Sequence, residues 1–149
     1  MKKMALVALF VVLLASQFGC ASSSLSRAAL DGNLQEVKVL VSQGEKINEI
    51  DKWGWTPLIW SVYYGNFPVT KWLLENGADP NIQTEQEYGT YQAGTTALIL
   101  AAAYGHDDAV EALLENKADP TVVDRKGKKA IDYAEEYSFD KCVALLRKN

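Results

Sequence analysis

The chain has 149 residues, of which 48% are hydrophobic and 23% charged, and its formal net charge is −4. This length and composition fit one globular domain and exclude two large ones. The acidic balance argues against phosphate-rich partners, so we expect no binding to nucleic acid.

The N-terminal segment, residues 1–19, has the pattern of a secretory signal peptide. Lys2 and Lys3 precede an uncharged apolar run over residues 5–15. A basic start followed by a short apolar run is typical of such signals, whereas a membrane-spanning helix needs about 20 apolar residues. Removal of this segment would change the net charge of the chain from −4 to −6.

The stretch "LLASQFGCASSS" resembles the lipobox of bacterial lipoproteins. The resemblance implies that Cys20 carries the lipid and that residues 20–24 form a tether. It departs from the family pattern at Gln17, where leucine is usual, and at Phe18. Because Ala21 follows the cysteine, the resemblance implies an outer-membrane lipoprotein that faces the periplasm. The alternative is ordinary signal cleavage, which gives a soluble periplasmic protein.

The rest of the chain repeats itself. A shift of 33 residues aligns Gly32 with Gly65, and a shift of 40 residues aligns Gly65 with Gly105. The seven extra residues form an insertion at 84–90. A final shift of 33 residues aligns the third unit with the C-terminal segment, so the sequence contains four units.

The units are similar to ankyrin repeats. The stretch "DKWGWTPLIWSVYYGNFPVTKWLLENGADPN" and the stretch "AGTTALILAAAYGHDDAVEALLENKADP" carry the family motifs most fully. The resemblance implies an all-α solenoid of four helix–turn–helix repeats with β-turn fingers. We expect a repeat domain at 25–149, with repeats at about 25–50, 51–83, 91–123 and 124–149.

Each unit is too small to bury its own apolar face, so the repeats must stack. We expect five side chains to lie in the stacking core: Val37, Leu40, Trp60, Trp72 and Val110. Lys117 and Ser138 stand where the family has glycine, and we expect local backbone strain at both. Cys142 is expected to be a buried, unpaired thiol.

The sequence offers no constellation for catalysis. His106 is the one histidine and falls on a turn between helices, where a structural role is expected. No phosphate-binding loop and no group of residues with metal-ligand spacing appears. Asp107 and Asp108 are neighbours at a helix start, where they favour the helix dipole. We therefore expect a non-enzyme without cofactor or metal; the rival hypothesis is a haem-handling protein that uses His106.

In the ankyrin family, partners bind to the finger tips and to the exposed side of the first helices. Mapping the repeat pattern onto this sequence places seven residues on that face: Lys52, Trp53, Trp55, Tyr63, Tyr64, Tyr104 and Tyr137. Tyrosine and tryptophan are enriched where proteins bind each other. The alternative is that these rings pack against one another and stiffen the turns.

The insertion adds four residues to the rim of the same face: Glu85, Glu87, Tyr88 and Tyr91. Long loops in compact domains are often functional. An acidic, aromatic loop favours a partner with a basic surface, although a tolerated surface insertion is the alternative.

These features predict a monomeric, non-catalytic protein-binding module, tethered to a membrane of the bacterial envelope by a lipid. Some envelope proteins of this family resemble immunity proteins that inhibit toxins, and we expect that role. The alternative is an accessory factor that supports an envelope enzyme such as a catalase.

Overall fold

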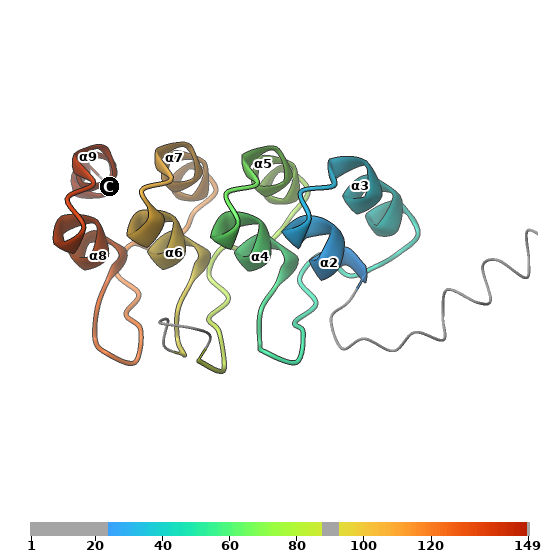
Figure 1. The fold of residues 1–149 in the computed structure, drawn as a ribbon, viewed down its shortest axis with the longest axis horizontal. Coiled ribbons are helices and arrows are strands. Elements are labelled where there is room, and N and C mark those ends of the chain that lie inside the picture. The colour runs from blue at the N-terminus through green and yellow to red at the C-terminus, as the bar shows by residue number, and fades with distance from the viewer. Residues whose placement is uncertain (1–23, 88–92, 149) are drawn as a thin grey trace, which may run out of the picture.

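A computed structural model describes residues 24–87 and 93–148. The described part contains eight α-helices and no strand, arranged as four pairs in a row (Figure 1). This confirms the expected all-α solenoid. The helices are α2 (Ser24–Leu30), α3 (Leu34–Ser42), α4 (Pro57–Tyr63), α5 (Phe67–Glu75), α6 (Ala97–Tyr104), α7 (Asp107–Glu115), α8 (Ala130–Glu136) and α9 (Asp140–Lys148).

The helices form two layers. The inner helices α2, α4, α6 and α8 lie in one row, and the outer helices α3, α5, α7 and α9 lie in a second row beside it (Figure 1). The segments that join one pair to the next project beyond the inner row as fingers (Figure 1). Each helix packs against its own partner and against its equivalents in the adjacent pairs.

The sequence starts the inner helices with capping residues. The hydroxyl oxygens of Thr56 and Thr96 accept hydrogen bonds from the backbone N–H groups of Ile59 and Ile99. Each bond satisfies a donor that the helix itself leaves without a partner. Pro57 occupies the first turn of α4, where a missing N–H costs nothing. The helix starts are therefore fixed locally.

The core runs the length of the array between the two layers. Residues 97–103 of α6 are all buried, because this helix has inner helices on both sides. Val37, Trp60 and Val110 are buried, as expected. Leu40 and Trp72 are only partly buried, although both pack against the core.

Hydrogen bonds from two asparagines set the spacing of the repeats. The side-chain oxygen of Asn48 accepts from Asp79 N at 2.9 Å, and its nitrogen donates to Gly77 O. One repeat later, Asn81 makes the same pair of bonds with Asp119 N and Lys117 O. Each side chain thus holds the end of the next outer helix.

The corner between the two helices of a repeat is closed by a residue of the next repeat. Asn66 donates to Ala29 O at 3.0 Å and to Leu30 O at 2.8 Å. His106 takes the same place beside Gly65, where a Cβ atom would come within 3.2 Å of the imidazole. The turn therefore needs both the left-handed backbone and the small size of glycine.

The two expected departures from the glycine pattern are confirmed. Lys117 has a φ of 67° and Ser138 a φ of 60°, so both adopt the left-handed conformation. For a residue with a Cβ atom this conformation costs roughly 1–2 kcal/mol. Each position thus stores local backbone strain.

Candidate functional site

Four aromatic rings of the second repeat form a continuous cluster. The ring centre of Trp55 lies 4.4 Å from that of Trp60 and 5.2 Å from that of Tyr63. Trp60 also stacks with Tyr64 at 6.2 Å. Tilted and offset arrangements of this kind stabilise aromatic pairs beyond simple burial. The cluster therefore combines a packed interior with an exposed edge.

The placement of Trp55 on the exposed face was wrong. Only 1% of its surface is exposed, whereas Trp53 is 37% exposed. In a regular strand two residues with this spacing would share one face. Gly54 lies between them with a φ of 74°, and this turn directs them to different sides. Tyr63 is half-buried between the cluster and the next repeat.

Sequence reasoning missed the aspartates that fasten the fingers. One carboxylate oxygen of Asp51 accepts from the backbone N–H groups of Trp53 and Trp55, and the other accepts from Trp60 Nε1 at 2.8 Å. The Asp-x-x-Gly pattern predicts the turn, but it does not predict the hydrogen bond between Asp51 and Trp60 of α4. Asp51 thus ties the finger to α4.

The last repeat uses the same device. Asp124 is buried, and it accepts from the backbone N–H groups of Lys126 and Lys128 and from the Tyr133 hydroxyl. Burial and this hydrogen bond raise the pKa of Tyr133. In the third repeat the helix position equivalent to Trp60 and Tyr133 is Leu100, which has no polar group to join such a bond.

Three tyrosines at equivalent positions form an exposed row, called here the tyrosine row. Tyr64, Tyr104 and Tyr137 stand at the ends of α4, α6 and α8, and they are 50%, 38% and 52% exposed. The ring of Tyr104 lies 5.4 Å from that of Tyr63, so the aromatic cluster continues into the third repeat. A hydrogen bond with Tyr104, together with burial, raises the pKa of Tyr63.

The finger tips lie beside this face. Lys52 Nζ sits 4.8 Å from the ring centre of Trp53, and Gln86 Nε2 donates to Lys52 O at 3.2 Å. Glu85 packs against Gly54 so closely that a Cβ atom there would lie 2.7 Å from Glu85 N. Glu85 and the exposed Glu87 therefore stand next to the Trp53 tip.

Tyr88 and Tyr91 lie outside the described residues. Their place in the binding face stays a prediction.

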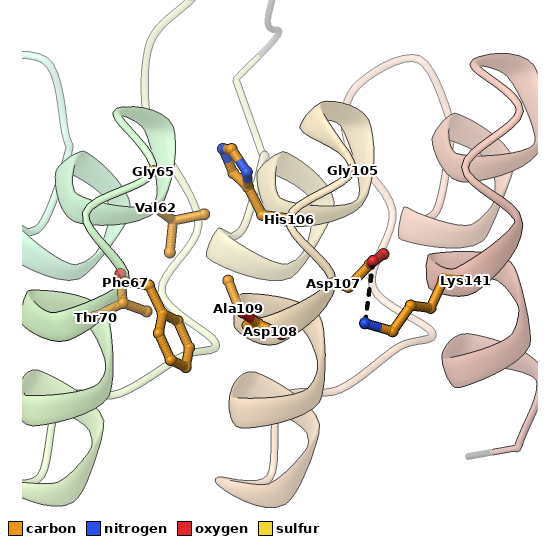
Figure 2. Close-up of a pocket in the computed structure, with 10 residues that line it drawn as sticks. All are labelled: Val62, Gly65, Phe67, Thr70, Gly105, His106, Asp107, Asp108, Ala109 and Lys141. Atoms are coloured by element: carbon orange, nitrogen blue, oxygen red, sulfur yellow. Dashed lines mark ion pairs between the residues drawn. The ribbon is translucent and has the colours of Figure 1, made fainter.

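His106 lines a hollow of about 360 Å³ that extends from Gly65 of the second repeat to Lys141 of the fourth (Figure 2). Its ring stacks on Tyr104 at 5.8 Å. Burial lowers the pKa of His106, and the negative charge of Asp107 opposes this effect only in part. The imidazole is thus a neutral packing group at the corner beside Gly65.

The two adjacent aspartates of α7 have different surroundings. Asp107 Oδ2 pairs with Lys141 Nζ at 3.3 Å (Figure 2). Asp107 Oδ1 accepts from Cys142 Sγ at 3.0 Å. Burial raises the pKa of the Cys142 thiol to about 12, so the thiol stays protonated at neutral pH. Asp107 holds α9 against α7, while Asp108 is exposed.

Models of known families match this repeat architecture. A model described as ankyrin repeats in three copies matches residues 6–84, and one described as ankyrin repeats in many copies matches residues 86–134. The chain belongs to the ankyrin-repeat family. Ankyrin repeats are protein–protein interaction modules and are generally non-catalytic.

Three curated proteins are similar to this chain over less than half of its length. The chain is 46% identical over 61 residues to ankyrin repeat protein nuc-2 of Neurospora crassa. These aligned residues make up 40% of this chain and 6% of that protein. It is also 42% identical to human Rabankyrin-5 over 62 residues, and this alignment covers 42% of this chain and 5% of that protein.

A third relative is a human protein named as DNA-binding protein RFXANK, with 36% identity over 66 residues, 44% of this chain and 25% of that protein. The chain thus spans at most a quarter of the length of these three proteins. Among the described helices, none has both the length and the hydrophobicity that crossing a bilayer requires.

Trp55→Ala should destabilise the protein far more than Trp53→Ala. Loss of a buried tryptophan costs about 3–5 kcal/mol, whereas an exposed one contributes little. Urea unfolding followed by circular dichroism measures both. Equal losses of unfolding free energy in the two variants would contradict the different burial of these side chains.

The stability of the ankyrin array should fall as the pH drops below about 6.5, the ordinary pKa of histidine. Because the pKa of His106 is lowered in the folded state, the unfolded chain takes up the proton first, and acid then favours unfolding. Unfolding midpoints at pH 7.5 and 5.5 measure the effect.

His106→Asn is the matched control, because Asn66 serves the equivalent corner. Between pH 7.5 and pH 5.5, the stability of this variant should fall much less than that of the unmodified protein. A fall of the same size in the variant would show that other groups cause it.

Proposed function

We propose that the tyrosine row and the Trp53 tip bind a protein partner. The observation that carries this proposal is the exposure of three tyrosines at equivalent positions of neighbouring repeats. Isolated exposed aromatics are common, but a row of them on one face is typical of an interaction surface. Four large exposed rings supply contact area at a low cost in side-chain entropy.

The face is well prepared for binding because its support is rigid. The tyrosine rings stand on the inner helices α4, α6 and α8, which pack directly against one another. Asp51 fastens the finger that carries Trp53. A surface that is ordered before it meets its partner loses less entropy on binding.

We further propose that the partner presents a basic surface to the rim of this face. Glu85 and Glu87 are exposed beside the Trp53 tip, and neither forms an ion pair within the described residues. Complementary charge at the rim of an interface speeds association and selects the partner.

The role proposed for this binding is inhibition of a toxin in the bacterial envelope. The lipobox-like stretch before the repeats supports a protein tethered by Cys20, and a small rigid binding face suits an immunity protein that blocks its target. Two or more acyl chains would hold such a protein on a membrane, since each buried CH₂ contributes about 0.8 kcal/mol.

Substitution of the tyrosine row by alanine, with Tyr64, Tyr104 and Tyr137 changed together, should abolish partner binding. Truncation of central aromatic residues costs about 1–2 kcal/mol or more each, so affinity should fall by at least 100-fold. The partner is first captured from envelope extract with the unmodified protein and identified by mass spectrometry. Calorimetry with the purified partner then measures the affinity.

The matched control changes three exposed apolar side chains outside the row, Val39, Ile50 and Val123, to alanine. This control should bind normally. Full affinity in the tyrosine variant would show that the face is not the binding site. Addition of the protein should lower the activity of the purified partner; a rise in activity would support an accessory factor instead.

Cys20→Ser should release the protein from the membrane fraction into the soluble periplasmic fraction, because the thiol carries the proposed lipid. Cell fractionation with immunodetection measures this. Cys142→Ser is the control and should stay in the membrane fraction, since that thiol is buried in the fold. Membrane retention of the Cys20 variant would rule out lipidation as the anchor.

A further inference from the structure

The outer layer carries a second surface feature, called here the seam groove. It consists of two adjoining hollows. The smaller, of about 280 Å³, lies between α5 and α7, and the larger, of about 360 Å³, extends around the start of α7 to Lys141 of α9. Phe67 and Asp108 line both hollows, so the two hollows are continuous there. Figure 2 shows the ring of Phe67 on α5 opposite Ala109 of α7.

The floor of the seam groove is apolar. Leu74 and Ala109 lie at its base and are almost fully buried, and Phe67 and Ala112 are half-buried above them. The phenyl ring of Phe67 therefore keeps part of its surface open to solvent. An apolar segment laid on this floor would remove that surface from water.

The walls of the seam groove are acidic. On α7 the carboxylates stand at Asp108, Glu111 and Glu115, a spacing that brings side chains onto one stripe of a helix. On α5 the wall carries Glu75 and one cation, Lys71. With four carboxylates and one ammonium group, these wall residues have a net charge of −3, and the ion pair of Asp107 and Lys141 in the larger hollow leaves this charge unchanged.

These carboxylates are not neutralised within the fold. Asp107 has Lys141 as a partner, but none of the four wall carboxylates forms an ion pair among the described residues. Glu111 and Glu115 are like charges four residues apart, an arrangement that destabilises a helix. A cation bound from outside would reduce the repulsion between these two carboxylates.

We propose that the seam groove docks a lysine- or arginine-rich amphipathic helix of a protein partner. Its apolar side would cover Phe67, and its cationic side chains would reach Asp108, Glu111 and Glu115. The flanking helices have nine residues each, about 13.5 Å of helix length at 1.5 Å per residue, which suits two to three turns of a bound helix. This surface belongs to the outer helices, whereas the tyrosine row belongs to the inner ones.

The test uses a synthetic 14-residue peptide of leucine and lysine arranged with helical spacing and labelled with fluorescein. Fluorescence anisotropy should detect saturable binding that weakens as salt is added. A peptide of the same composition in an order that breaks the amphipathic pattern should bind more weakly. Equal binding of the two peptides would overturn the proposal.

A matched pair of variants locates the binding. Glu111→Gln with Glu115→Gln should weaken peptide binding roughly fivefold, as expected for the loss of two exposed ion pairs. Glu36→Gln with Glu49→Gln removes the same charge elsewhere and should leave binding unchanged. Equal weakening in both variants would show a general attraction to an acidic protein and overturn the proposal, as would the absence of any binding.

The outcome is separable from that of the proposed function. The alanine variant of the tyrosine row should still bind the peptide, and the Glu111/Glu115 variant should still bind the partner captured through that row. Loss of peptide binding in the tyrosine variant would show that the peptide binds the inner face instead.

Discussion

The stacking of one helix pair against the next is the constraint on which this protein depends. No pair can bury its own apolar face, and α6 shows the result, because residues 97–103 are buried only with α4 and α8 on either side. Every surface of the array is therefore shaped by residues of two repeats. The corner beside Gly65 is closed by His106, and the finger beside Gly54 is backed by Glu85.

This constraint explains why so much could be predicted from the sequence and where prediction failed. Helix starts, the glycine turns and the strained Lys117 follow from local patterns that recur with each repeat. Trp55 was misplaced because the turn at Gly54 reverses the direction of its side chain. The bond from Asp51 to Trp60 was missed for a related reason, since it depends on how the finger folds back onto α4.

The two candidate sites also differ in how far the sequence predicts them. The tyrosine row could be predicted, because equal spacing puts its members on equivalent helix ends. The acidic stripe of α7 is visible in the sequence, but the opposing Phe67 and the different surroundings of Asp107 and Asp108 are not. Asp107 contacts Lys141 and Cys142, which are more than 30 residues away along the chain. The packed array thus distinguishes Asp107, a partly buried carboxylate with partners, from the exposed Asp108.

The Asp–aromatic bond that fastens two of the fingers has a consequence for the length of the third. In the third repeat Thr84 takes the place of the aspartate: its backbone N–H donates to Thr95 O, and its hydroxyl oxygen accepts from Thr95 N. Leu100 stands at the position of the aromatic partner. The seven-residue insertion lies in the connection to this same repeat. Because the bonds between Thr84 and Thr95 close the base of this finger, residues can be added between these two positions while α6 keeps its place. Among the last three repeats, the one with leucine at the aromatic position is thus the one whose connecting loop is longer.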